Sequence, residues 1–163
     1  MIRLKEQIFS PGRTICINLK GSEKLICFLC SAGEGITKWA SETMDHDPLK
    51  FYMIDILGSL VVDSAMDIIE SRLEEDCFRK GLRITNRYSP GYCGWKLVEQ
   101  KELFSAFPKG FCNIELTSSS LMIPIKSISG IIGTGKNAQR RAYDCEICSM
   151  MDCIYRSLRN VTT

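Results

Sequence analysis

One long helical segment, residues 49–80, constrains the fold of this chain more than any other feature of its sequence. Asp47 and Pro48 form a helix start, since Asp accepts hydrogen bonds from free N–H groups and Pro fits the first turn. Gly81 provides the stop, because glycine tolerates the left-handed backbone that ends many helices. The apolar positions recur every three or four residues: Ile54, Leu57, Val61, Ala65 and Ile68. We predict that this stripe is the buried face of the helix.

The same segment has a second face that is acidic. Its carboxylates also follow helical spacing: Asp63, Asp67, Glu70 and Glu74. A stripe of this kind is ordinarily a solvated helix face, because carboxylates are rarely buried without a partner. From periodicity alone we therefore expect these four side chains to face solvent.

Shorter apolar runs around the long helix predict strands and two further helices. Residues 24–30 form a nearly continuous apolar run, which is typical of a buried central strand. The other predicted strands span 1–9, 15–19, 82–85, 121–125 and 127–132, and the other helices span 36–43 and 97–107. Strands and helices do not alternate as regular βαβ units, so we predict an α+β fold built on an antiparallel sheet, with residues 1–163 as a single domain.

The composition excludes several classes of protein. The chain is 45% apolar and 25% charged, which is ordinary for a soluble domain. A net charge of +2, with no Lys/Arg run longer than two residues, predicts no nucleic-acid partner. No apolar run is long enough to span a bilayer, so we expect no membrane partner. The N-terminal residues lack the apolar core of a signal peptide, and we expect a cytoplasmic protein with reduced thiols.

Nine cysteines in a reducing compartment need an explanation other than disulfides. Three of them, Cys145, Cys148 and Cys153, lie at C-x2-C-x4-C spacing in a C-terminal tail, residues 140–163. This spacing indicates either a metal site, holding zinc or an iron–sulfur cluster, or a set of free thiols. A fourth ligand is missing from the run, and Cys93 and Cys112 are the candidates for it.

Two other motifs resemble functional ones but favour structural roles. Cys27 and Cys30 have the spacing of a redox pair but lie within an apolar strand, so we expect them to pack in the core. Residues 130–137 nearly fit the P-loop pattern, but Asn137 replaces the Ser or Thr that holds magnesium. We reject a nucleotide hydrolase and expect these glycines to form a loop after a strand.

We find no pattern that predicts a catalytic residue. His46 is the only histidine and lies in a polar helix break, where a solvated side chain is expected. Ser118, Ser119 and Ser120 have no base partner in the sequence, so nucleophilic serine catalysis has no support.

The segment Arg87–Tyr92 combines groups suited to a small zwitterionic ligand. Arg87 offers a planar fork of donors that matches a carboxylate. Pro90 and Gly91 force a turn, and Gly91 leaves the backbone open to another molecule. Tyr92 can stack and donate a hydrogen bond at once. Taken alone, such a segment is more often only a turn beside a solvated arginine.

The motifs that follow this segment, taken together with it, resemble one known protein family. The block Arg-x-x-Pro-Gly-Tyr is followed by residues 99–104, by Leu116-Thr-Ser-Ser-Ser-Leu-Met-Ile-Pro124 and by Lys126-Ser-Ile-Ser-Gly130. In this order the set resembles the activation (S-adenosylmethionine-binding) domain of vitamin B12-dependent methionine synthase, in its stand-alone form, over residues 25–135. The resemblance implies a twisted antiparallel sheet flanked by helices.

The resemblance also implies a ligand site. In the family, the arginine of the block meets the carboxylate of S-adenosylmethionine, backbone groups of the block contact the ligand, and the tyrosine lies alongside; these map to Arg87, Ser89, Gly91 and Tyr92. An acidic residue on the preceding long helix meets a positively charged part of the ligand. Asp63 matches it, where the family usually has Glu, and Asp67 follows one turn later.

The function implied is that of an accessory component of a methyltransferase. The domain presents S-adenosylmethionine to cobalamin held by a partner, either the cobalamin-binding module of methionine synthase or another corrinoid protein. Flavodoxin or ferredoxin is the implied electron donor for the reductive remethylation of cob(II)alamin. Two alternatives stay open: a corrinoid-protein or iron–sulfur accessory module that does not bind S-adenosylmethionine, and a regulatory sensor of that ligand.

Overall fold

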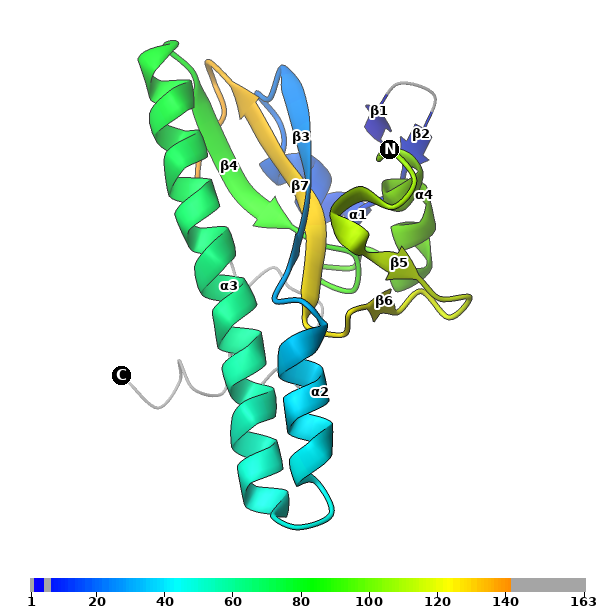
Figure 1. The fold of residues 1–163 in the computed structure, drawn as a ribbon. Helices are drawn as coiled ribbons and strands as arrows, with labels where there is room; N and C mark the ends of the chain where they lie inside the picture. The colour runs from blue at the N-terminus through cyan, green and yellow to red at the C-terminus, as the bar shows by residue number, and fades with distance from the viewer. Residues whose placement is uncertain (1, 5–6, 142–163) are drawn as a thin grey trace, which may run out of the picture.

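The long helix predicted from the sequence is α3, Pro48–Arg79, in a computed structural model that describes residues 2–4 and 7–141 (Figure 1). The Asp47 side chain accepts a hydrogen bond from the backbone N–H of Lys50 at 3.0 Å, which caps the helix. Gly81 follows the last turn with φ 69°, the left-handed backbone expected at a helix end. The predicted helix and both of its boundaries are therefore confirmed.

The face that α3 buries differs from the predicted stripe. Leu57, Val61 and Ile68 are exposed. Ile54 is buried as predicted, but the other buried positions lie outside the predicted stripe: Gly58, Val62, Met66, Glu70 and Cys77. Apolar residues occur on more than one side of α3, so periodicity alone could not choose among them. Gly58 lets α3 approach its neighbours closely, because a Cβ there would lie 3.0 Å from Lys126 and 3.2 Å from Ile36 of the neighbouring helix.

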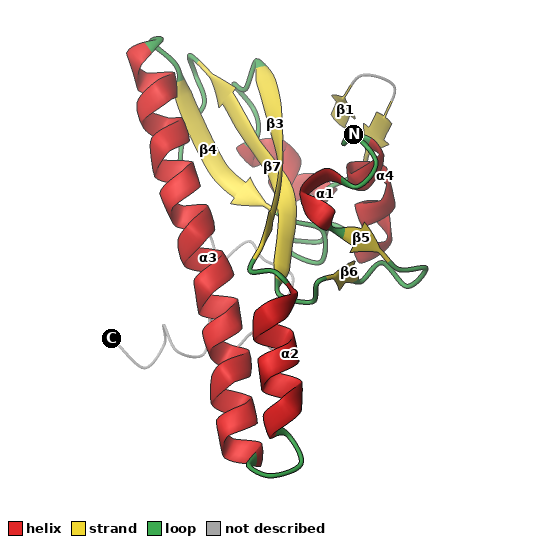
Figure 2. Cartoon of the chain, in the orientation of Figure 1, coloured by secondary structure: helices red, strands yellow, loops and turns green. Residues whose placement is uncertain are grey.

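The main sheet is antiparallel and has the strand order β3–β7–β4 (Figure 2). Its strands are β3 (Lys24–Ser31), β4 (Arg83–Tyr88) and β7 (Ser127–Gly135). The prediction that residues 24–30 form a central strand was wrong in position, since β7 is central and β3 is an edge. The strand β7 is more buried than β3, because β7 has a neighbouring strand on each side.

The remaining elements surround this sheet. They are β1 (Ile2–Leu4), β2 (Gln7–Phe9), α1 (Gly12–Asn18), α2 (Glu34–Thr43), the short helices η1 (Leu97–Glu99), α4 (Gln100–Ser105) and η2 (Phe111–Asn113), and the strands β5 (Glu115–Leu116) and β6 (Met122–Ile123). The predicted single strand over 1–9 is a β1–β2 hairpin. The strand predicted over 15–19 is also wrong, because these residues belong to α1 and its C-terminal cap. Ile15 and Leu19 are four residues apart and both buried, which suits a helix.

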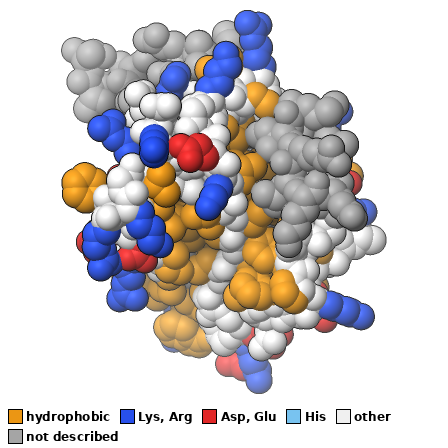
Figure 3. All heavy atoms as spheres, turned by 90° about the horizontal axis from the view of Figure 1, so that it is seen from above, with side chains coloured by type: hydrophobic (Ala, Val, Ile, Leu, Met, Phe, Trp, Pro, Cys, Tyr) orange, Lys and Arg blue, Asp and Glu red, His pale blue; other side chains and the backbone are white. Residues whose placement is uncertain are grey.

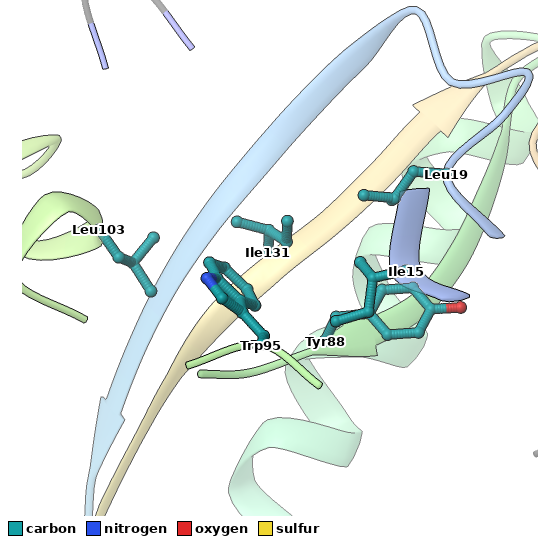
Figure 4. Close-up of a cluster of buried hydrophobic side chains, with 6 residues drawn as sticks. All are labelled: Ile15, Leu19, Tyr88, Trp95, Leu103 and Ile131. Carbon is teal, nitrogen blue, oxygen red and sulfur yellow. The ribbon is translucent and has the colours of Figure 1, made fainter. Parts of the chain in front are cut away.

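Two hydrophobic clusters hold the layers together, one on each face of the sheet. The first packs α1 and α4 against the sheet through Ile15, Leu19, Tyr88, Trp95, Leu103 and Ile131 (Figure 4). The second packs α3 on the opposite face through Phe28, Met66, Cys77, Ile84 and Ile132. Residues on either side of the sheet alternate along β7, so the neighbours Ile131 and Ile132 enter different clusters. This alternation fixes which side of β4 faces α3.

The glycines of residues 130–137 correct another prediction. Gly130, Gly133 and Gly135 lie within β7 and do not form a loop after it. A Cβ at Gly130 would meet the Tyr88 carbonyl oxygen and the Phe28 ring, and one at Gly133 would meet the Ser22 hydroxyl. These glycines therefore allow close packing in the middle of the sheet.

We predict that Gly130→Ala lowers the free energy of unfolding by about 1–3 kcal/mol, the usual cost of overpacking a core. Urea unfolding followed by circular dichroism measures this change. Gly35→Ala is the matched control, because no atom lies within 4 Å of a Cβ at Gly35 in α2. That control is expected to be neutral or stabilising by about 0.5–1 kcal/mol, since alanine favours helix. An unchanged stability of Gly130→Ala contradicts the close packing.

Among the helices that the structure describes, none is both long enough and apolar enough to cross a membrane.

Candidate functional site

Arg87 lies at the end of β4 and faces helix α3. It pairs with Ile132 of β7 in the sheet, so its side chain projects from the same face as Ile132. This corrects the prediction that β4 ends before Arg87, because the strand continues to Tyr88. The Arg87 side chain is 24% exposed, which leaves its guanidinium accessible from solvent.

The acidic face of α3 surrounds the Arg87 guanidinium. Nη1 lies 2.7 Å from the Asp67 carboxylate and 3.5 Å from Glu70, and Nη2 lies 3.6 Å from Asp63. The Arg87–Asp67 contact is a charge-assisted hydrogen bond. The structure thus brings together Arg87 and Asp63, two predicted site residues that are far apart in the sequence, with Asp67 closer to the guanidinium than Asp63.

Glu70 links this cluster to a second arginine. Its carboxylate lies 3.1 Å from Arg140, which also meets Glu74 at 2.9 Å. Asn86 holds the backbone at Arg141 through two hydrogen bonds, and so positions the neighbouring Arg140. The side chain of Glu70 is only 9% exposed, whereas we expected all four carboxylates to face solvent. We call Asp63, Asp67, Glu70, Glu74, Arg87 and Arg140 the charged cluster.

Residues 89–95 follow β4 and close into a tight turn, whose Cys93 and Trp95 pack with the first hydrophobic cluster, on the sheet face opposite the Arg87 side chain. The backbone N–H of Gly91 donates to the Trp95 carbonyl at 2.8 Å, and that of Trp95 donates to Tyr92 at 2.9 Å. Gly91 has φ 95°, a backbone angle that favours glycine. Ser89 is half-buried, while Gly91 and Tyr92 are exposed. The turn therefore presents the Tyr92 ring to solvent at the end of the strand that carries Arg87.

Two surface hollows lie away from this turn. One, of about 580 Å³, is lined by the α4 region and η2, including Phe104, Phe107 and Phe111. The other, of about 400 Å³, lies beside the charged cluster and is lined by Phe78, Arg83 and Arg140 among others. Neither hollow is lined by Arg87, Ser89, Gly91 or Tyr92.

Four cysteines in the described part of the chain pack with the hydrophobic clusters: Cys27, Cys30, Cys77 and Cys93. Cys27 packs with the first hydrophobic cluster and Cys30 with the second, so the two thiols project from opposite faces of β3. Burial raises the pKa of the Cys30 thiol, the neighbouring Cys112 raises it further, and the Ser31 backbone and Arg87 partly offset the rise. The raised pKa keeps Cys30 protonated at neutral pH, where a thiol is a poor nucleophile.

The predicted metal ligands Cys145, Cys148 and Cys153 lie outside the described residues. Among residues 2–4 and 7–141, no group of three or more His, Cys, Asp or Glu side chains is arranged to hold a metal ion. Cys93 packs against the first hydrophobic cluster, and Cys112 is exposed in η2. The structure therefore leaves the proposed zinc or iron–sulfur site untested.

Sequence reasoning missed the role of Arg140. Its segment follows β7 and reaches the charged cluster only because β7 lies beside β4, and no motif marks it. The place of Glu70 in the charged cluster could have been predicted, because Glu70 shares helical spacing with Asp63 and Asp67. That spacing identified the acidic face correctly but could not reveal what packs against it.

Basic and acidic side chains are interspersed on the face of the protein that Figure 3 shows. On this face (Figure 3), Lys and Arg side chains lie mostly on the left and upper parts, some of them inside the outline, with acidic side chains among them and hydrophobic side chains between them. A nucleic-acid site ordinarily gathers basic side chains into a stripe or patch. The charged cluster instead places carboxylates next to guanidinium groups, which suits a small ligand that carries both charges.

The fold and the charged cluster define an α+β domain in which carboxylates of a long helix surround an arginine of the sheet. Comparison with protein families then gives the particular family. The family model described as "Vitamin B12 dependent methionine synthase, activation domain" matches residues 15–149. The chain belongs to this family, and the family connects it with a B12-dependent methionine synthase. A search of curated proteins found no match to the chain.

Proposed function

We propose that this domain binds S-adenosylmethionine at Arg87 and the turn that ends in Tyr92, and so supports the remethylation of cob(II)alamin on a partner protein. The partner's corrinoid supplies the methyl-accepting cobalt, and flavodoxin or ferredoxin supplies the electron. The observation that carries the proposal is the meeting of Arg87 with Asp63 and Asp67 in a member of the activation-domain family.

The charges of the cluster complement those of the ligand. S-adenosylmethionine carries a carboxylate, an ammonium and a sulfonium. Arg87 matches the carboxylate, while Asp63 and Asp67 match the positive groups. Both aspartates are exposed, with 56% and 67% of their side chains accessible, so a ligand can reach them without a change in the core.

The orientation of Arg87 supports this assignment. Its Nη1 atom is engaged by Asp67 and Glu70, whereas Nη2 lies 3.6 Å from Asp63. A separation of 3.6 Å is too long for a hydrogen bond. A ligand carboxylate can therefore bind at Nη2 while Asp67 and Glu70 hold the other side of the guanidinium.

The other groups of the turn have positioning roles. The half-buried Ser89 and the exposed Gly91 offer backbone groups beside the ligand, and the Tyr92 ring offers a flat surface on which the adenine or ribose can lie. None of these residues needs to move a proton. The domain would act by orienting the methyl group, which is a proximity effect.

The function is tested with a corrinoid-binding partner module poised as cob(II)alamin. We expect that this domain, S-adenosylmethionine and a reductant together convert the cob(II)alamin absorption spectrum to that of methylcobalamin. Omitting either the domain or the methyl donor is expected to prevent the conversion. Conversion at the same rate without the domain contradicts the proposed function.

The alternative of an accessory module that does not bind S-adenosylmethionine remains a separate proposal. Iron analysis and the visible spectrum of anaerobically purified protein test its cluster component. Cluster-bound iron without S-adenosylmethionine binding would favour that alternative over reactivation.

A further inference from the structure

An apolar seam runs along the first half of α3. Leu49, Met53, Ile56 and Leu60 are spaced four, three and four residues apart, which is the spacing of the a and d positions of a coiled coil. Their exposed fractions are 70%, 63%, 41% and 57%. Tyr52 and Leu57 lie beside them and are also exposed. Side chains of this size, arranged along one helix face, ordinarily pack against another helix.

The described part of the chain leaves the seam uncovered. This half of α3 extends past the end of the sheet, and α2 lies beside it (Figure 1). The packing against α2 uses other positions, including Gly58, which lies close to Ile36. Asp55 is held by Lys126 at 2.7 Å, so the acidic side chain nearest the middle of the seam is already paired. The four seam positions carry no charge.

The area of the seam suits a contact between two copies. The exposed parts of the six apolar side chains amount to roughly 600 Å², the upper end of what a monomer ordinarily leaves in one patch. Two such faces together give about 1,200 Å², the lower limit of a specific and stable interface. A second copy therefore supplies a partner surface of matching size and chemistry.

The seam is also complementary to itself when two copies run antiparallel. A two-fold axis between Ile56 and Leu57 places Met53 of one copy opposite Leu60 of the other, because each lies the same number of residues from the axis. The same axis places Ile56 of one copy against Leu57 of the other. Leu49 of each copy then lies opposite Ser64, at the outer edge of the contact, so the central pairs are apolar and the outermost pair is not.

We propose that the seam on α3 is a homodimer interface, in which two α2–α3 hairpins pack antiparallel through Leu49, Met53, Ile56 and Leu60. This inference goes beyond the proposed function and does not depend on it, since it uses no residue of the charged cluster.

Sedimentation velocity of the full chain tests the proposal. We expect the wild-type protein to sediment with twice the chain mass of 18.4 kDa at micromolar concentration. Met53→Lys and Leu60→Glu are each expected to give monomers, because each places unpaired charges in the apolar interface. Ile125→Glu is the matched control, since Ile125 is 67% exposed but lies outside the seam, and it should remain dimeric.

Mixing the two charged variants tests the antiparallel arrangement. Met53→Lys and Leu60→Glu, each monomeric alone, are expected to form a heterodimer when combined, because the new Lys and Glu face each other across the two-fold axis. Circular dichroism of each variant shows whether it is folded. A monomeric wild-type protein overturns the proposal, and so does a dimer that folded seam variants leave intact. Failure of the mixture to associate overturns the antiparallel register.

Discussion

Replacing Glu70 by alanine is expected to lower the free energy of unfolding by about 2 kcal/mol. The Glu70 carboxylate is nearly buried and pairs with both Arg87 and Arg140. Removing one partner from a buried ion pair leaves the remaining charge without compensation, which costs about 3–5 kcal/mol when burial is complete. The two arginines here are 24% and 43% exposed, so solvent compensates part of this cost.

The neighbouring Glu74 provides the control for this prediction. It pairs with the same Arg140 at 2.9 Å but is half exposed. Exposed ion pairs contribute at most about 1 kcal/mol, so Glu74→Ala is expected to have a smaller effect than Glu70→Ala. Urea unfolding of both variants gives the comparison. If the two substitutions lower the free energy of unfolding by the same amount, the stronger contribution assigned to the buried Glu70 is contradicted.

Arg87→Ala is expected to weaken S-adenosylmethionine binding by about tenfold to 100-fold. A hydrogen bond to a charged group contributes about 1.5–3 kcal/mol, and each 1.4 kcal/mol corresponds to a factor of ten in affinity. Arg87→Lys keeps the charge but loses the planar fork, so we expect an intermediate affinity. Titration calorimetry measures all three proteins.

Arg79→Ala is the matched control for Arg87→Ala. Arg79 is exposed and pairs with Asp76 at the far end of α3, away from the turn at Gly91. We expect this variant to bind like the wild-type protein. Wild-type affinity in a folded Arg87→Ala variant contradicts the proposed site, and weaker binding by Arg79→Ala would point to a general electrostatic effect.

Elements were predictable from the sequence where residues with a strong backbone preference mark their ends. Asp47, Pro48 and Gly81 define α3 because each has a backbone preference that acts locally. The inner face of α3 was not predictable in the same way, because the helix is apolar on several sides and local sequence does not show which side packs against the sheet. The short run from Ile15 to Leu19 is ambiguous between helix and strand for a related reason, since few residues define its period.

The candidate site was predictable in its parts but not in its full extent. The family resemblance identified Asp63 and Arg87, and the structure brings their charged groups within 3.6 Å. Periodicity placed Asp67 and Glu70 on one helix face and predicted exposure for both, which is right for Asp67 and wrong for Glu70. Periodicity contains no information about the strand packed against that face. Arg140 depends on the pairing of β7 with β4, a long-range contact that local sequence does not encode. Gly130 resembled part of a phosphate loop, whereas its role is to let Tyr88 and Phe28 approach β7.

The most direct test of the proposed ligand site is a calorimetric titration of the wild-type protein with S-adenosylmethionine and, separately, with S-adenosylhomocysteine. The two ligands share the carboxylate and ammonium, and only the first carries the sulfonium charge. We expect saturable binding of one S-adenosylmethionine per chain, several-fold tighter than S-adenosylhomocysteine, because exposed carboxylates such as Asp63 and Asp67 add up to about 1 kcal/mol for a nearby positive charge. The absence of saturable binding by the folded wild-type protein would contradict the account.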